Sequence, residues 1–300
     1  MKRLLCVGIA VAAMVGSAAC CPHPILTTGR NYIGPTSTLY EVVEHINANN
    51  RPITTLYADH HFRAWIHDGK HPEPHYIDGD GQLLFRKFPN KPDELLLTGE
   101  NLGVGPVFEI GSTTGPDAKF WVAVVPKMAK EWWGYCKNIG KPCVTEHLPI
   151  RPDLVTEVLG IGDIPSDLME PPAPVMRFIN EEDAYVFTWV APLTDRIIVQ
   201  KEIWYDRATY LPKRVILYDE NGRALIKAKL ADHAAVAGTN GVKIAREFQL
   251  EFPESQDILF ITLYGPRLKK RGVPKDGTIE MRPIGDEHAI QKIQIDENCP

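Results

Sequence analysis

Residues 213–230 read KRVILYDENGRALIKAKL, and this stretch decides the fold of the chain. Asn221-Gly222 lies between two apolar runs, and this dipeptide favours a β-hairpin turn because both residues tolerate a positive φ. After the turn, residues 224–230 alternate between apolar and charged side chains, with Lys227 and Lys229 on one side. One face of this hairpin is therefore expected to contact water and the other to be covered.

The same alternation continues on both sides of the hairpin and predicts a long run of antiparallel strands. Residues 242–252 (VKIAREFQLEF) again alternate apolar with polar side chains. In the second half, strands are expected at residues 185–190, 197–205, 213–218, 224–230, 242–252 and 257–264. In the first half, they are expected at residues 53–67, 82–88, 94–99 and 120–125, with a turn at Gly79-Asp80-Gly81.

A helix before the strands offers the best available cover for the sheet. Ser37 is a good N-cap residue, and Asn47–Pro52 is a strong stop signal. Between them, apolar residues recur at helical spacing on one face. These residues are Leu39, Val42, Val43 and Ile46. A second, short helix is expected at residues 151–159. The expected fold class is mainly β (α+β): a strongly curved antiparallel half-barrel sheet covered by one or two helices.

The N-terminus has the features of a lipoprotein signal peptide, which we assign to residues 1–19. Its apolar run, Leu4–Val15, is shorter than the roughly 20 residues that a membrane-spanning helix needs. Small residues lead into Cys20, whose thiol would carry the lipid, although Ser17 stands where a lipobox usually has leucine. Ordinary secretion and an uncleaved anchor are the alternatives. The expected location is the cell envelope, periplasm-facing, at the outer membrane.

The rest of the chain divides into three expected parts. Residues 20–35 are rich in Pro, Gly and Thr and predict a tether. Residues 36–268 form the half-barrel domain, and residues 269–300 form a C-terminal extension. Cys136 and Cys143 flank a Gly-Lys-Pro turn, and we expect them to form a disulfide in an oxidising compartment.

No catalytic, cofactor or metal site is expected. The histidines between His60 and His75 are interpreted as solvated residues at the rim of a hairpin, although imidazoles also suit zinc or copper. Residues 111–115 lack the ending of a phosphate loop, and no Gly-x-Ser-x-Gly elbow occurs. The net charge of −5 disfavours a nucleic-acid partner, and the basic cluster at residues 267–275 is interpreted as a solvated loop. We therefore expect a binding protein and not an enzyme.

Several short motifs, taken in order, resemble those of a known family. Ile46-Asn-Ala-Asn-Asn50 ends the first helix and precedes the strand that begins Ile53-Thr-Thr-Leu56. Ile203-Trp-Tyr-Asp206, Leu211-Pro-Lys-Arg214 and Tyr218-Asp-Glu-Asn-Gly222 follow. This order resembles the LolA/LolB-like lipoprotein carrier superfamily over residues 38 to about 264. It is most similar to lipoprotein members of uncharacterised function.

The resemblance implies an open half-barrel with a helical lid and an apolar cavity that holds a lipid acyl chain or a lipoprotein. Cavity-side residues are expected to be Leu39, Val42, Ile46, Trp121, Phe187, Trp204, Phe248 and Phe260. The expected partners are the membrane, through the lipid on Cys20, and acyl chains, with an envelope protein as a further partner. The alternative is a non-catalytic envelope scaffold of the same fold with a filled core.

Overall fold

The chain folds around one large sheet, seen here in a computed structural model. The structure describes residues 32–67, 73–88, 92–125, 129–145, 148, 150–193, 195–268 and 290–299. The predicted signal peptide, Cys20 and most of the tether lie outside these residues.

The described strands form a 14-stranded sheet that is almost entirely antiparallel. Its order is β16-β6-β5-β4-β3-β2-β1-β15-β14-β11-β10-β9-β8-β7. Its strands in the first half are β1 (Thr55–Ile66), β2 (His75–Arg86), β3 (Glu94–Asn101), β4 (Gly105–Ser112), β5 (Lys119–Val124) and β6 (Lys130–Tyr135). Those in the second half are β7 (Ala173–Ile179), β8 (Ala184–Pro192), β9 (Ile197–Asp206), β10 (Pro212–Tyr218), β11 (Ala224–Ala231), β14 (Glu247–Phe252), β15 (Asp257–Arg267) and β16 (Gln291–Gln294). A separate small sheet pairs β12 (Ala234–Ala235) with β13 (Lys243–Ile244).

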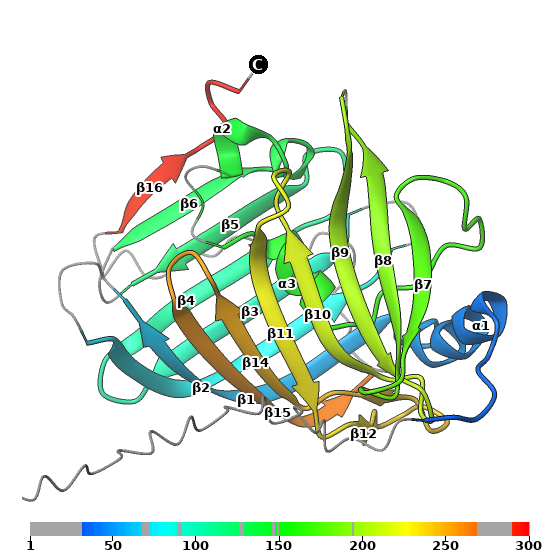
Figure 1. Ribbon diagram of the computed structural model, residues 1–300. Helices are drawn as coiled ribbons and strands as arrows, with labels where there is room; N and C mark the ends of the chain where they lie inside the picture. The colour runs from blue at the N-terminus through cyan, green and yellow to red at the C-terminus, as the bar shows by residue number, and fades with distance from the viewer. Residues whose placement is uncertain are drawn as a thin grey trace, which may run out of the picture.

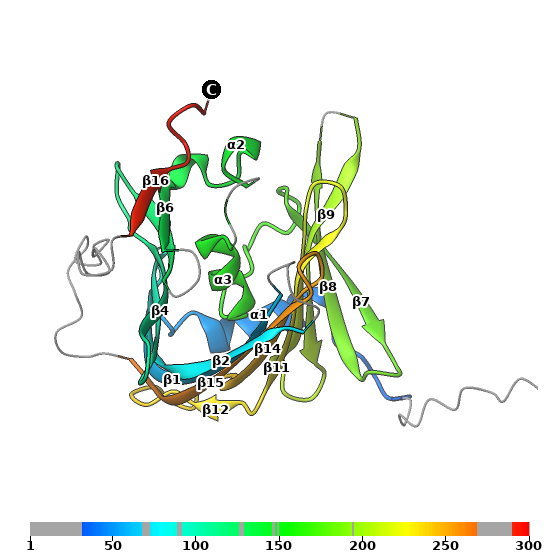
Figure 2. The ribbon, with the colours of Figure 1, turned by 90° about the vertical axis from the view of Figure 1, so that its left-hand side faces the viewer.

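The sheet curves strongly, and its two edges do not meet (Figures 1 and 2). The helical elements are α1 (Leu39–Asn50), η1 (Cys136–Asn138), α2 (Pro142–Thr145) and α3 (Pro152–Val158). Figure 2 shows α3 inside the concavity, with α2 above it near β6 and α1 crossing behind it. The predicted half-barrel with helices on its covered face is therefore confirmed.

The first helix begins one residue later than the sequence indicates. Thr38, and not Ser37, is the N-cap, because its side chain accepts from the backbone N–H of Glu41. The Glu41 carboxylate in turn accepts from the Thr38 backbone N–H at 2.7 Å, which completes a capping box. The apolar face of the helix is buried, with Val42 and Ile46 in the core.

The predicted turn at Gly79-Asp80-Gly81 is wrong, because these residues lie within β2. The two glycines lie where the neighbouring backbone approaches closely: a Cβ on Gly81 would be 1.8 Å from the Thr98 carbonyl oxygen. Glycine in a strand can mark such a close approach as well as a turn. The sequence also did not indicate β4, β6 and β7 as strands.

The predicted disulfide between Cys136 and Cys143 is wrong as well. Cys143 in α2 pairs with Cys299, 156 residues away, and Cys136 is a free thiol. Cys299 follows β16, which pairs in parallel with β6. Residues of the predicted C-terminal extension thus add a strand to the same sheet and are fastened to it covalently.

Candidate functional site: the concave face and its cover

The concave face of the sheet is the apolar side of nearly every strand. Buried core residues from β1, β3, β5, β8, β11 and β14 join those of α1 and α3 in one cluster. Of the residues predicted to line a cavity, Val42, Ile46, Phe187 and Phe248 lie here, between 0% and 4% exposed. Leu39 packs against the same cluster and is partly buried. These five residues are thus brought together in a packed layer.

The other three predicted cavity residues lie on the convex face, and their placement is a correction. Trp204 alternates with Ile203 and Tyr205, which belong to the core, so its side chain lies on the other side of β9. Phe260 pairs with Arg63, whereas the neighbouring Ile261 is in the core.

Trp121 follows the same rule. Phe120 and Val122, its neighbours in β5, are both in the core. The Trp121 side chain therefore lies on the opposite face, where its indole Nε1 donates to Glu109 Oε1 at 2.7 Å. The ring also lies over Gly111, because a Cβ there would be 2.1 Å from it.

A separate layer covers the concave face, and it consists of α3 and the segment that follows it. We call residues 159–168 the strap. Helix α3 contacts β4 and β5 on one wall and β10 on the other, so it bridges the half-barrel. Val155 and Val158 of α3 and Ile161 and Ile164 of the strap are buried in the core cluster.

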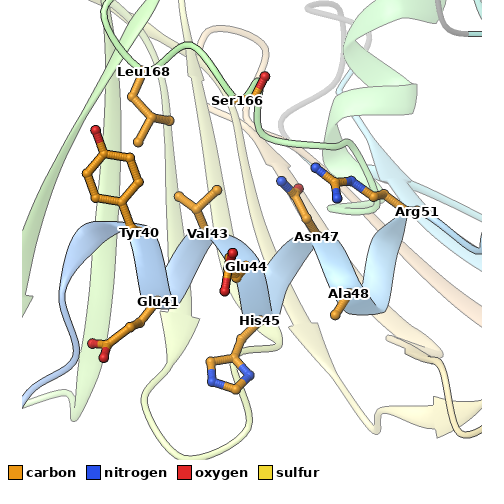
Figure 3. A pocket seen from close by; sticks show the side chains of 10 residues that line it. All are labelled: Tyr40, Glu41, Val43, Glu44, His45, Asn47, Ala48, Arg51, Ser166 and Leu168. Carbon is orange, nitrogen blue, oxygen red and sulfur yellow. The ribbon is translucent and has the colours of Figure 1, made fainter.

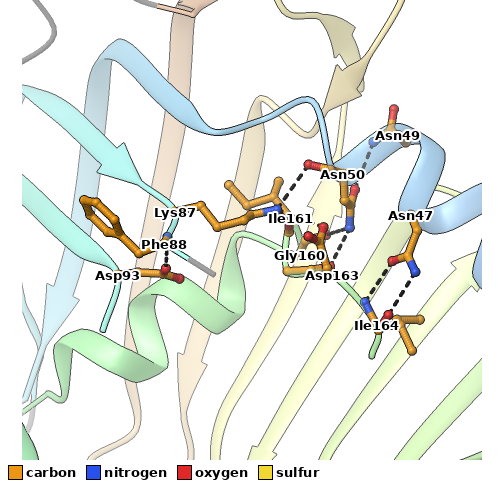
Figure 4. Close-up of polar contacts among 11 residues, drawn as sticks. Asn47, Asn49, Asn50, Lys87, Phe88, Asp93, Gly160, Ile161, Asp163 and Ile164 are labelled. Carbon is orange, nitrogen blue, oxygen red and sulfur yellow. Dashed lines mark hydrogen bonds and ion pairs between the residues drawn. The ribbon is translucent and has the colours of Figure 1, made fainter. Parts of the chain in front are cut away.

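Helix α1 holds the strap through two buried asparagines (Figure 4). The Asn47 amide makes a pair of hydrogen bonds with the backbone of Ile164: Nδ2 donates to its carbonyl at 2.9 Å, and Oδ1 accepts from its N–H at 2.8 Å. Asn50 Nδ2 donates to the Gly162 carbonyl at 2.7 Å. Both side chains are buried, and Asn47 satisfies Ile164 groups that water does not reach, whereas the Asn50–Gly162 contact is only partly buried.

Lys87, just after β2, holds the strap from the opposite side (Figure 4). Its ammonium donates to the carbonyls of Asn50 at 3.1 Å and Ile161 at 2.9 Å, and to Asp163 Oδ1 at 3.0 Å. One cation thus joins the end of α1 to the strap. Nearby, burial raises the pKa of Asp93, whose carboxylate accepts from the Phe88 backbone N–H at 3.0 Å.

A groove of ≈ 520 Å³ lies between α1 and the end of the strap (Figure 3). Val43, Ala48 and Leu168 provide apolar lining, and Tyr40 stands exposed at its rim. Glu41, Glu44 and Arg51 add charges along the helix. The groove marks the place where the strap meets the helix at the surface.

The described residues do not assemble a metal site: no group of three or more His, Cys, Asp or Glu side chains could hold an ion there. Among the predicted histidines, His60 is buried, and burial lowers its pKa to about 4. His61 and His67 instead contact Asp80 and Asp257, and His71 lies outside the described residues. Within the described part of the chain, no helix combines the length and apolar character needed to cross a bilayer.

The polar residues that hold the strap were not predicted from the sequence. Asn47 and Asn50 were present in it as part of a helix stop signal and of the family motif. Several asparagines gather at the end of a helix that is otherwise apolar on one face. This concentration of amide side chains is the signal that could have marked them. Lys87 follows a strand, its side chain is only 15% exposed, and no local pattern in the sequence distinguishes it.

Comparisons with known proteins bear on the fold of the chain. No family model matches the sequence, and no curated protein matches it. Among solved structures, an outer membrane lipoprotein-sorting protein domain from Vibrio parahaemolyticus is similar with a TM-score of 0.52 at 13% identity, over 78% of this chain and 93% of that chain. A DUF1329 family protein from Desulfovibrio piger is similar with a TM-score of 0.50 at 12% identity, over 85% of this chain and 100% of that chain.

A LolA superfamily protein from Nitrosomonas europaea aligns with a TM-score of 0.46 at 12% identity, over 78% of this chain and 94% of that chain. At these identities the likeness concerns the fold. The chain therefore shares the fold of the lipoprotein-sorting protein domain, in agreement with the fold that the resemblance of its motifs predicted.

Proposed function

We propose that this chain is a lipid-anchored envelope protein that binds an acyl chain, from a lipid or a lipoprotein, on the concave face of its half-barrel. The observation that carries the proposal is the construction of the core in two layers. One layer is a wide apolar sheet, and the other is α3 with the strap, which lies across it. The lipid on Cys20 would keep the protein at the membrane from which acyl chains come.

In the structure the strap and α3 fill the concave face, so an acyl chain needs the strap to move. Asn47, Asn50 and Lys87 hold the strap by hydrogen bonds to its backbone carbonyls. Gly160, with a φ of 68°, and Gly162 lie near the start of the strap. Glycine tolerates a wide range of backbone angles, so these two positions could rotate when the strap moves. Displacing the strap would expose apolar surface, whose burial by a hydrocarbon is worth about 25 cal/mol per Å².

The test uses the mature chain with Cys20→Ala, so that its own lipid does not compete. A fluorescent fatty acid is titrated in and then displaced with palmitate. Lys87→Met removes the cation that joins α1 to the strap, and it should shift the population toward the open strap. If that shift is about 1.4 kcal/mol, the apparent affinity for the probe rises about tenfold. Lys137→Met, at an exposed position away from the strap, is the matched control and should leave the affinity unchanged.

A second candidate function is an envelope scaffold with a permanently filled core. It is favoured by the burial of Val42, Ile46 and Phe187, each at most 1% exposed. In that case neither the parent chain nor Lys87→Met binds the probe displaceably, and the substitution only lowers stability. This result would remove the acyl-chain proposal.

A further inference from the structure

The convex face carries a row of cations that runs across the strands, and it lies on the opposite side of the sheet from the proposed acyl-chain site. Successive strand pairs align Arg177 with Val186, Val186 with Trp204, and Trp204 with Arg214. The row continues from Arg214 through Lys229, Gln249 and Phe260 to Arg63. We call Arg177, Arg214, Lys229 and Arg63 the cation strip.

Two members of the strip rest on aromatic rings of the same row. The Arg214 guanidinium lies 4.4 Å from the centroid of the Trp204 ring, and that of Arg63 lies 5.4 Å from the Phe260 ring. Within the described residues, neither arginine makes an ion pair, although Asp78 lies directly opposite Arg63 in β2. Stacking holds a guanidinium in place while its N–H donors remain available for an anion.

The other two members are exposed, and each has one carboxylate nearby. The side chain of Arg177 is 58% exposed and 3.3 Å from Glu202, and that of Lys229 is 60% exposed and 3.5 Å from Glu251. The Lys229–Glu251 pair is exposed on both sides and contributes about 0–1 kcal/mol, so a ligand can replace it. Glu202 is only 12% exposed and also accepts from the Trp204 indole N–H, so Arg177 offers its exposed side to a ligand while keeping this partner. Lys227, exposed in the adjacent row, adds a further cation. The row itself thus carries four cations and one carboxylate, Asp78 opposite Arg63 in β2, while Glu202, Glu247 and Glu251 lie in the rows on either side.

The dimensions and position of the strip limit what it can bind. Four strand spacings separate Arg214 in β10 from Arg63 in β1, a distance of about 19 Å along the sheet. The strip crosses central strands, whose backbone groups are already paired, so a peptide cannot add there as a strand. A flat bilayer would touch only part of a face that curves away on both sides. An extended polymer that carries acidic groups and apolar ring faces fits both the cations and the aromatic rings.

We propose that the cation strip binds an anionic polysaccharide. Arg214 and Arg63 would contact its acidic groups, and Trp204 and Phe260 would pack against the C–H faces of its sugar rings. This site is independent of the acyl-chain proposal, because none of its residues faces the concave side.

The experiment measures binding of fluorescently labelled polygalacturonate to the mature chain with Cys20→Ala, at two salt concentrations. Neutral dextran, polyglutamate and vesicles containing anionic phospholipid are compared in parallel. We expect salt-sensitive binding of polygalacturonate, and the double substitution Arg214→Ala with Lys229→Ala should weaken it at least about tenfold. Arg214→Lys keeps the charge without the planar stack and should weaken it less. Lys213→Ala, which removes a neighbouring cation in β10 that contacts Glu182, is the control and should have no effect.

Several results would overturn the proposal. They are an unchanged affinity in the double variant, equal loss in the Lys213→Ala control, or stronger binding to polyglutamate or to vesicles than to polygalacturonate. If the double variant does not fold, Lys227→Ala with Lys229→Ala applies the same test at two positions that lie on the solvent side of β11. Circular dichroism melts of each variant separate loss of binding from loss of structure.

Discussion

Replacing Asn47 by alanine should destabilise the protein far more than the same change two residues later. Asn47 and Asn49 lie in the same helix, and each makes the same pair of hydrogen bonds with one backbone unit. Asn47 pairs with Ile164 at 2.9 and 2.8 Å, and Asn49 pairs with Lys243 at 2.9 and 2.9 Å. The difference is burial: Asn47 is 2% exposed, whereas the Asn49 pair is accessible to water.

The expected magnitudes follow from that difference. In Asn47→Ala the N–H and C=O of Ile164 lose their partner in a place that water does not reach. An unsatisfied buried group costs about 1–3 kcal/mol, so we expect the free energy of unfolding to fall by about 3 kcal/mol. In Asn49→Ala water replaces the lost partner, and the fall should stay near 0.5 kcal/mol. Both substitutions also favour helix slightly, which affects the two variants equally.

The assay is equilibrium unfolding in urea, followed by tryptophan fluorescence of the chain's six tryptophans. The slope with denaturant should be similar in all three proteins, so that the midpoints report stability. Hydrogen exchange at the Ile164 amide should also rise in Asn47→Ala and not in Asn49→Ala. Equal destabilisation by the two substitutions would show that burial of the strap contacts does not govern their contribution.

Two further predictions concern the cysteines and His60. The double substitution Cys143→Ser with Cys299→Ser opens a loop of 156 residues and should lower the free energy of unfolding by about 5 kcal/mol in the chain-entropy model. Cys136→Ser, at a free thiol, should change it little. Urea unfolding with and without reductant measures both effects, and an unchanged stability of the double variant would contradict the prediction. The pKa of His60 is about 4 in the folded chain, against about 6.5 when unfolded, so the unfolded state binds more protons between these values. Stability is therefore complete above pH of about 6.5 and falls by about 3 kcal/mol as the pH drops to about 4. His60→Gln, which keeps a donor for the Thr98 carbonyl, should show a smaller fall over this range in pH-dependent urea unfolding, and an unchanged fall would refute the assignment.

The contacts that hold the strap join parts of the chain more than 70 residues apart, which places them beyond any local pattern. Asn47 and Ile164 are 117 residues apart, and Lys87 and Ile161 are 74 apart. The sequence indicates a helix stop at Asn47–Pro52, and this is correct. It does not indicate that the asparagines of this stop would hold a distant backbone segment. The same reason explains the disulfide: nearness in sequence favoured Cys143 with Cys136, whereas the pairing of β16 with β6 at the sheet edge brings Cys299 to it.

Local periodicity determined the elements of this fold. The period of two in residues 224–230 appears in β11, where Ile226, Ala228 and Leu230 are buried and the two lysines are exposed. The apolar face of residues 39–46 is likewise buried in α1. These features depend on backbone geometry within one element, so they can be read without knowing the neighbours.

Which face of each strand is covered was decided by the tertiary structure. Trp121 and Trp204 each stand between two apolar neighbours. Alternation along the strand puts each tryptophan on the face opposite to its neighbours, but it does not tell which of the two faces carries the core. Only the direction in which the 14 strands curve, and the side on which α3 and the strap lie, placed Phe187 on the concave face and these tryptophans on the convex face. Curvature and cover arise from contacts between residues far apart in the chain, and a local pattern contains no information about them.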